Sequence, residues 1–453
     1  MSKLYQRPQK AGGIYLRLDF ASLHVSGMEW GDRTTIEDGV LFVNRVDAVA
    51  ACGDFGCFKG IALHIARPGE DIRIVPVKNV IEPRCKMTEE GAIFPGIIGG
   101  MKQAGTGSTL ALKGAAVVVT QSNDEDGRCR TGGFIDMSGP ATEYCPFSSL
   151  YNLVLEAKVD PDAYRENESA VDEACHLASL RLSVYLAESC KDLVPDSFTP
   201  YDLGDPNAAD RELPGVVYVM QMLAQNPLIK DFYIYGQLAG ATMLPTVLHP
   251  NEIIDGAFTT YIGSHCTVCS DKQYLYEVQN SPVIEELFRL HNDKVRFLGV
   301  LVHNEVLTME GKERCSLQTA KLAEMLGAKG AILVTEGHGN PDEDIMLNVR
   351  NLEKAGVKTV IISDELGGRD GRSPGLADWV RECNAMVSVG NTHEILAVPK
   401  ETGTFIGNPA SMEIVHIDIE EQPENPAYFY TEMNHIAGSC AQAGLARLSA
   451  RWI

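Results

Sequence analysis

Apolar and polar residues alternate through much of the first 150 residues, and a spacing of two is typical of strands with one buried face. Between the strand patterns, residues 91–107 are rich in glycine, which leaves little room for helix. We therefore expect residues 1–150 to form a β-rich N-terminal region with long loops. The predicted strands are residues 13–24, 39–43, 46–50, 72–77 and 115–120.

The spacing of apolar residues changes after residue 150. From residue 161 to residue 191 they recur on one face of a long predicted helix. Short apolar runs at 216–220 and 232–236 indicate buried segments. Residues 151–265 are therefore expected to be a mixed α/β region.

Strand and helix patterns alternate regularly in the last third of the chain. Such alternation favours right-handed βαβ crossovers and a parallel sheet. The sequence thus predicts an α/β protein in which a β-rich N-terminal part precedes a C-terminal Rossmann-like domain over residues 266–453. Its predicted strands are 295–302, 330–335, 359–363 and 385–389, and its predicted helices are 316–326, 344–355 and 376–383.

The size of the chain indicates how many domains it can form, and its charge indicates which partners are unfavourable. The chain has 453 residues and a mass of 49.3 kDa, enough for two or three domains. Its 61 acidic and 39 basic residues give a formal charge of −22, which argues against nucleic acid and anionic membranes as partners. No stretch approaches the ~20 apolar residues of a membrane helix, and the first residues lack an apolar signal core, so we expect a cytoplasmic protein. Its 12 scattered cysteines should then be mostly free thiols.

Two polar, glycine-rich loops follow predicted parallel strands, at residues 336–342 and 364–371. Ligands of open parallel sheets bind beyond the carboxyl ends of the strands, so Glu336, Asp364 and Arg369 are candidates for substrate binding or proton transfer. Gly337-His338-Gly339 is only part of a dinucleotide fingerprint. Alternatively, the glycines merely turn the chain and Asp342 caps the next helix.

The densest cluster of reactive side chains is GSHCTVCSDK at residues 263–272. A zinc site would need another close pair of ligands, and Cys52 and Cys57 are too widely spaced to supply a strong one. A redox dithiol would open a helix, whereas these residues indicate a loop. The third possibility is backbone cleavage, in which a thiol attacks the preceding carbonyl and a pyruvoyl group forms at the new terminus, with His265 as proton carrier. The local residues leave all three open.

Motifs along nearly the whole chain resemble component B of the glycine, sarcosine and betaine reductases of anaerobic bacteria, which is related to the pyruvoyl proprotein of D-proline reductase. These motifs are TTIEDGVL at 34–41, IEPRCK at 81–86, IDMSGP at 135–140 with Tyr144 and PFS at 146–148, DGA at 255–257, Asp271-Lys272, QNSPVI at 279–284, EGHGNPD at 336–342, and Asp364-Glu365 with GRDG at 368–371.

The resemblance implies that a cysteine of the central stretch becomes a pyruvoyl group by autocatalytic cleavage. Aligning Asp271-Lys272 without gaps favours Cys266 over Cys269 as that cysteine. Cleavage before Cys266 would leave chains of 265 and 188 residues (453 − 265). Their shares of 49.3 kDa are about 29 and about 20 kDa.

The resemblance also implies an oxidoreductase subunit that acts in Stickland fermentation. The pyruvoyl carbonyl would bind the amine of glycine or sarcosine and weaken its C–N bond for reductive cleavage. The carboxymethyl group would pass to selenoprotein A, assisted by the selenocysteine-containing gamma subunit of component B. Component C would form acetyl phosphate, and a thioredoxin-type disulfide donor would supply electrons.

The remaining candidates have narrower roles. His265 and Asp271 are candidates for proton transfer during maturation, and Lys272 or Arg369 for binding a substrate carboxylate. His265 stands where the family has a small polar residue, and residues 267–270 also depart from its pattern. An unprocessed homologue, acting as a metal or redox CxxC protein or as a non-catalytic partner subunit, is therefore the alternative.

Overall fold

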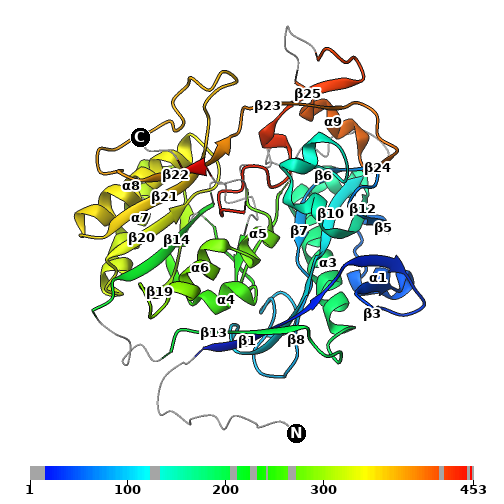
Figure 1. Ribbon diagram of the computed structural model, residues 1–453, viewed down its shortest axis with the longest axis horizontal. Helices are drawn as coiled ribbons and strands as arrows, with labels where there is room; N and C mark the ends of the chain where they lie inside the picture. Colours follow the sequence, from blue (N-terminus) through cyan, green and yellow to red (C-terminus); the bar gives the residue numbers. More distant parts are fainter. Residues whose placement is uncertain are drawn as a thin grey trace.

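The computed structural model describes residues 16–122, 133–204, 212–224, 232–240, 243–263, 272–417, 423–445 and 449–450. Its two halves are a parallel sheet with helices, on the left of Figure 1, and a β-rich part on the right. Helices α4 (Pro250–Ile254), α5 (Leu275–Gln279) and α6 (Pro282–Leu290) lie between them. The central stretch of the sequence therefore leads into α5 between the two halves.

The largest described sheet has the order β17-β19-β14-β20-β21-β22-β26. Neighbours from β19 to β22 are parallel, and β17 and β26 add antiparallel edges. This confirms the predicted parallel strands. Their bounds are β17 Thr246–Leu248, β19 Arg296–Glu305, β14 Gly215–Leu223, β20 Gly330–Val334, β21 Lys358–Glu365, β22 Met386–Asn391 and β26 Ser449–Ala450.

Both faces of this sheet are buried. Val217 and Val219 of β14 belong to the core that the sheet shares with α7 (Met309–Met325) and α8 (Asn340–Lys354). Tyr218 and Met220 point the other way, into a core shared with α6 and the N-terminal half. Since successive side chains of a strand face opposite sides, each strand must be apolar throughout, which is why these strands are continuous apolar runs.

The β-rich half is built from smaller sheets. In spatial order they are β13 (Ser197–Asp202), β1 (Arg17–His24), β9 (Gly107–Lys113) and β8 (Arg84–Lys86); β5 (Phe58–Ala66), β12 (Tyr151–Val159), β10 (Ala115–Ser122) and β7 (Asn79–Ile81); β11 (Gly133–Asp136), β6 (Ile72–Val77) and β24 (Thr404–Gly407); and β2 (Gly27–Trp30), β4 (Val40–Val43) and β3 (Thr35–Glu37). The short ones are β16 (Gln237–Leu238), β15 (Phe232–Ile234) and β18 (Phe258–Thr260), and β23 (Ile395–Pro399) with β25 (Tyr428–Glu432).

Two predictions in the first part of the chain differ from the helices observed: one strand prediction is wrong, and one predicted helix is confirmed but is divided in two. Residues 46–50, predicted as a strand, lie in α1 (Arg45–Cys52), because Asn44 caps the helix by accepting from the backbone N–H groups of Val46 and Asp47. The long predicted helix is two helices, α2 (Pro161–Glu166) and α3 (Glu168–Glu188), because Asn167 ends the first and caps the second. α9 (Met412–Val415) is the last helix described.

The helix predicted at 376–383 is wrong. The chain there is irregular, and Ala377 donates its backbone N–H to Oδ2 of Asp342 at 2.7 Å. Leu376, Val380 and Cys383 are nevertheless buried in the core beside α8. Their helix-like spacing therefore reflects burial alone.

The sheets cross both predicted domain boundaries. β14 precedes residue 265 yet lies at the centre of the parallel sheet, and β24, near the C-terminus, pairs with β6 of the N-terminal half. The division at residues 150 and 265 and the Rossmann-like character of the last part stay predictions. What the structure describes is a mixed α/β fold with a parallel sheet.

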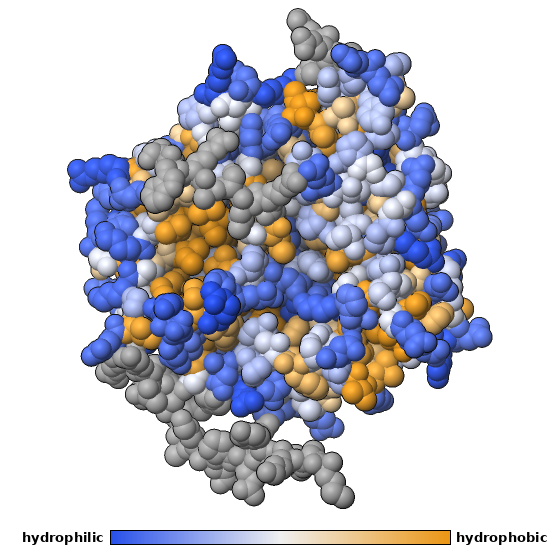
Figure 2. Space-filling view, viewed as in Figure 1, coloured by the Kyte–Doolittle hydropathy of each residue, from blue (hydrophilic) through white to orange (hydrophobic). Residues whose placement is uncertain are grey.

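The visible surface is mostly hydrophilic. In Figure 2 hydrophilic side chains dominate this face, and the largest apolar area lies on the left, over the part that holds the parallel sheet. Within the described ranges, no helix is both long and apolar enough to cross a membrane.

Candidate active site

A buried ion pair joins the central stretch to the parallel sheet. Nζ of Lys272 lies 2.9 Å from Oε2 of Glu336, and neither side chain is exposed. The Glu336 carboxylate also accepts from the backbone N–H groups of Gln273 and Leu223, each at 2.9 Å. Because Leu223 ends β14 and Glu336 follows β20, the chain that leaves the central stretch is fixed at the carboxyl edge of the sheet.

A second buried carboxylate supports the first. Oε1 of Glu305 accepts from Gln221 at 3.0 Å, from the Thr335 hydroxyl at 2.9 Å and from the backbone N–H of Glu336 at 3.3 Å. Burial, with the nearby charges of Asp344 and Glu336, raises the pKa of Glu305 well above its ordinary value. Burial also raises the pKa of Glu336, although Lys272 opposes the shift. The arrangement thus favours a proton on Glu305 and leaves the charge on Glu336.

A small polar cavity of about 10 Å³ lies beside Lys272 and Gln273. Oε2 of Glu277 accepts from the backbone N–H of Tyr274 at 2.6 Å, and burial raises the pKa of Glu277 to about 8. Three atoms here have no hydrogen-bond partner within the described part of the chain: Nε2 and Oε1 of Gln273, and Oε1 of Glu277. Ser439, Cys440 and Gln442 complete the polar lining.

A histidine and a carboxylate extend this region. Nε2 of His338 lies 3.4 Å from Oδ2 of Asp364, whose Oδ1 accepts from the Gln442 amide at 2.5 Å. Burial and the neighbouring His393 lower the pKa of His338 to about 4, so its imidazole is neutral near pH 7. Gln442 touches the small cavity and Asp364, so the loops after β20 and β21 meet the segment around residue 440 here.

The predicted catalytic residues His265, Cys266, Cys269 and Asp271 lie outside the described residues. The predicted substrate-binding residues are all among the described residues, and each of them contacts another residue of the protein. Lys272 and Glu336 pair with each other, and Asp364 binds Gln442 and lies beside His338. Arg369 pairs with Glu432 at 3.1 Å and is 45% exposed. Substrate contact by any of them stays a prediction.

Asp342 is not the N-cap residue of α8, but it stands in the first turn of that helix and its carboxylate interacts with the backbone of the N-cap residue Gly339. The N-cap position of α8 is Gly339, which has no side chain to cap the helix, and the Asp342 carboxylate also accepts from the backbone N–H of Ala377 at 2.7 Å. The loop glycines at 337 and 339 do turn the chain, with φ of 71° each.

Metal and redox sites are not evident in the part of the chain that the structure describes. It contains no group of three or more His, Cys, Asp or Glu that could hold a metal ion. Cys52 is buried at the end of α1, and burial raises the pKa of its thiol to about 12. Cys440, at the small cavity, also has a raised pKa through burial and the nearby Asp364. These cysteines are therefore protonated thiols near pH 7.

Several site residues were missed by sequence reasoning. Glu277 could have been found, because it stands three residues after Tyr274 in the pattern of a capping box. Gln273 directly follows the Asp271-Lys272 motif but has no pattern of its own. Cys440 and Gln442 lie in a segment without periodicity, so only the folded chain reveals their position.

Motifs that carry the resemblance meet in a second charged cluster. Arg84 bonds Glu82 at 2.8 Å and Asn280 at 3.0 Å, which joins the motifs at 81–86 and 279–284. Lys86 pairs with Asp255 at 2.7 Å and joins the first of these to the motif at 255–257. Stretches far apart in sequence are thus one structural unit, which explains why they occur together.

Comparison with known proteins identifies the family. The family model described as glycine/sarcosine/betaine reductase component B subunits matches residues 16–451. The glycine reductase complex component B subunits alpha and beta of Peptoclostridium acidaminophilum are 36% identical over 441 residues, covering 96% of this chain and 100% of that protein. The sarcosine reductase complex component B subunit alpha of the same organism is 36% identical over 389 residues, covering 85% of this chain and 88% of the relative. The corresponding betaine subunit is 35% identical over 393 residues, covering 85% and 86%.

No solved structure matches the chain. The family match spans nearly all of the sequence and includes every motif named above. The chain therefore belongs to the family of glycine/sarcosine/betaine reductase component B subunits.

Proposed function

We propose that this chain is the precursor of the pyruvoyl subunit of a glycine-, sarcosine- or betaine-type reductase complex. In this proposal Cys266, or less favourably Cys269, becomes the pyruvoyl group. The single observation that carries the proposal is the buried Lys272–Glu336 pair, because it fixes the end of the central stretch beside a polar cavity at the carboxyl edge of the sheet.

The residues beside the central stretch fit a carbonyl-bearing group. A pyruvoyl group supplies an electrophilic carbonyl that draws electrons from the C–N bond of a bound amine. The buried Gln273 amide has both a donor and an acceptor unused within the described residues, so it can orient a polar group. Glu277, with a pKa of about 8, can hold a proton at Oε1 in the same cavity.

The roles of the charged residues follow from their contacts. Lys272 is committed to Glu336, so we assign it to positioning the central stretch and not to binding a substrate carboxylate. Neutral His338, whose Nε2 lies 3.4 Å from Oδ2 of Asp364, is suited to exchanging a proton near this edge. Arg369 lies on a half-exposed surface pair and is the weaker candidate for a carboxylate anchor.

Processing into two chains is supported by a relative's name. One chain whose whole length is matched is named for two subunits, alpha and beta. We propose the same for this chain, with the selenocysteine-containing gamma subunit of component B and selenoprotein A as partners. Component C and a thioredoxin-type electron donor would complete the reductive cleavage.

Intact mass spectrometry of the protein from its native anaerobic host tests the proposal, with a parallel sample treated with borohydride and ammonium. We expect chains of about 29 and about 20 kDa (265/453 and 188/453 of 49.3 kDa), the smaller beginning with a reducible carbonyl. Cys266→Ala should abolish cleavage, and Cys269→Ala should not. A single unmodified 49.3 kDa chain would overturn the proposal and favour a metal or redox CxxC protein or a non-catalytic subunit.

A further inference from the structure

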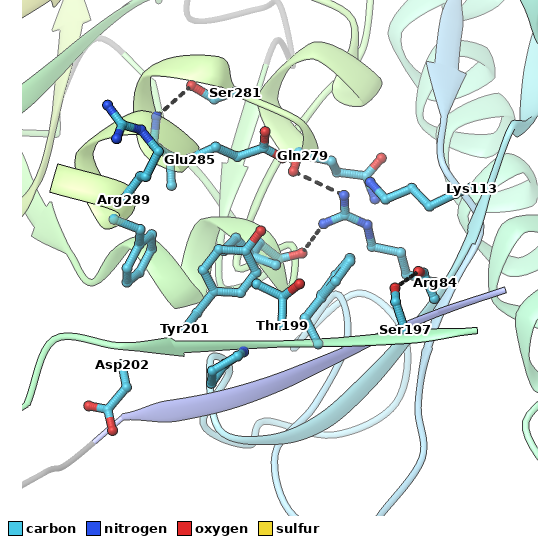
Figure 3. Close-up of a pocket in the computed structure, with 16 residues that line it drawn as sticks. Arg84, Lys113, Ser197, Thr199, Tyr201, Asp202, Gln279, Ser281, Glu285 and Arg289 are labelled. Atoms are coloured by element: carbon cyan, nitrogen blue, oxygen red, sulfur yellow. Dashed lines mark hydrogen bonds between the residues drawn. The ribbon is translucent and has the colours of Figure 1, made fainter. Parts of the chain in front are cut away.

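A cavity of about 550 Å³ lies between β1 and β13 on one side and α6 on the other (Figure 3). Its volume is within the ~300–1,000 Å³ typical of small-molecule sites. Among the described residues, none lines both this cavity and the small cavity beside Lys272. Helix α5 contributes to both cavities, because Glu277 lines the small one and Gln279 lines the larger one.

The inner end of this cavity is cationic. Arg84, almost fully buried, bonds Glu82, the carbonyl oxygens of Ile254 and Gln279, and Asn280. Nζ of Lys113 bonds Asn280 at 2.7 Å and lies 3.0 Å from Oε1 of Glu82. Figure 3 shows Arg84 and Lys113 together on the side of the cavity away from Arg289.

The charges of this cluster do not balance. Two cations, Arg84 and Lys113, share the single carboxylate of Glu82. Burial alone would raise the pKa of Glu82, but the attraction of the two cations outweighs burial and lowers this pKa, so the carboxylate is charged. The Lys113 side chain remains 34% exposed and an ammonium has three donors, of which Glu82 and Asn280 take two. One donor of Lys113 is thus available to an anion, and the three-residue cluster of Arg84, Lys113 and Glu82 carries one net positive charge (2 − 1).

The walls of the cavity are aromatic and hydroxylated. Phe20 and Tyr201 are in edge contact with ring centroids 5.8 Å apart, and Phe288 lies 4.9 Å from Tyr201. The hydroxyls of Ser22 and Ser197 bond each other at 2.6 Å along the β1–β13 pair. Such walls suit a ligand with an apolar body and one polar end.

A further carboxylate limits the ligand's charge. Glu285, on the exposed side of α6, also lines the cavity, and its charge disfavours a second negative group on the ligand. Asp202 is engaged by the backbone N–H of Gly204 at 2.7 Å, and Arg289 pairs with Glu286. The positive charge is therefore local to the Arg84–Lys113 end of the cavity, and the donor left over belongs to Lys113, because Arg84 is held by Glu82, Asn280 and two carbonyl oxygens.

We propose that this cavity is a second ligand site, which binds a small organic monocarboxylate with its carboxylate at Lys113 and its apolar part against Phe20, Tyr201 and Phe288. The lining residues that the structure describes all lie outside the central stretch, so binding at this site is tested separately from pyruvoyl formation.

Fluorine NMR of the full-length protein tests this, with 4-fluorobenzoate as the probe and 4-fluorobenzamide as its neutral counterpart. We expect the acid to bind and the amide to bind at least tenfold more weakly. Lys113→Met should weaken binding of the acid at least tenfold, whereas Lys113→Arg should retain it. Lys59→Met, at an exposed position of β5, is the matched control and should not change binding.

A second variant guards against a folding defect in Lys113→Met. Thr199 is exposed on β13 and lines the cavity, so Thr199→Phe should fill the cavity and abolish binding without disturbing the core. The proposal is overturned if 4-fluorobenzoate does not bind the unaltered protein, if the amide binds equally well, or if Lys113→Met and Thr199→Phe both bind the acid normally.

Discussion

The ammonium group of Lys272 lies 2.9 Å from Oε2 of Glu336, and both side chains are removed from solvent. The two residues are 64 positions apart: Lys272 is the last residue of the central stretch, and Glu336 follows β20. Their pairing holds Lys272 at the edge of a parallel sheet, where the backbone ends of several strands converge. The energetic weight of this pair distinguishes it from the surface ion pairs of the same region.

Removal of Lys272 should therefore destabilise the protein strongly. Lys272→Met leaves the buried Glu336 carboxylate without its cation, and breaking a buried pair costs about 3–5 kcal/mol of unfolding free energy. Arg369→Met is the matched control, because its pair with Glu432 is half exposed and contributes about 0–1 kcal/mol. Urea unfolding of the three proteins measures both, and equal losses would contradict the ranking.

Glu277 should make stability fall as the pH rises. Its folded pKa is about 8 against an ordinary value of 4.5, so between these pH values the folded state binds more protons than the unfolded state. Each pH unit in this window removes up to about 1.4 kcal/mol of stability. Glu277→Gln should remove the fall, and unfolding of both proteins at pH 5, 6, 7 and 8 measures it. Exposed Glu285→Gln should follow the unaltered protein, and parallel curves for all three would refute the assignment.

Gly256 should tolerate no side chain. Its φ is +71°, and a Cβ there would lie 2.3 Å from Cδ1 of buried Phe94. Gly256→Ala should cost about 1–2 kcal/mol for the backbone and about 1–3 kcal/mol for the overlap. Gly69→Ala, at φ +86° with nothing within 4 Å of the added Cβ, should lose only the about 1–2 kcal/mol that comes from the backbone. Thermal unfolding compares the two, and similar losses would show that the ring of Phe94 moves aside.

Local sequence patterns predicted the parallel strands because each is an apolar run that ends at polar or glycine residues. Residues 330–335 and 359–363 are examples, observed as β20 and β21. The helix α1 was not predicted, because its start depends on the side chain of Asn44 and not on apolar spacing. β14 was predicted as a segment, but its central place in the sheet depends on pairing with strands 80 or more residues away.

In the candidate site, too, local patterns predicted some residues, whereas contacts between distant parts of the chain were not predicted. Glu336, Asp364 and Lys272 were singled out because loops after parallel strands and motifs near reactive residues are visible locally. The sequence did not predict that Lys272 forms an ion pair with Glu336, since an ion pair depends on the distance between the two side chains in the folded chain. Gln442 reaches Asp364 across 78 residues, and no periodicity marks either side of that contact.

Gln273 offers a test that separates a functional residue from a structural one. Its amide is buried beside the small cavity, and within the described residues neither amide atom has a hydrogen-bond partner. Burying an unpaired polar group costs about 1–3 kcal/mol, so Gln273→Met should leave the unfolding free energy unchanged or raise it. If the amide orients the pyruvoyl group or its substrate, the same variant should lower reductase activity of the assembled complex at least tenfold.

The matched comparison for Gln273 is Gln103→Met, because the Gln103 amide bonds Tyr235 at 2.8 Å and Glu252 at 3.0 Å, away from the small cavity. That variant should lose about 1 kcal/mol of stability with its hydrogen bonds and keep its activity. Intact mass spectrometry of both variants shows whether an activity loss arises during chain cleavage or after it. A Gln273→Met protein that is destabilised, cleaved normally and fully active would show that the amide serves packing alone, since only a structural role combines those three results.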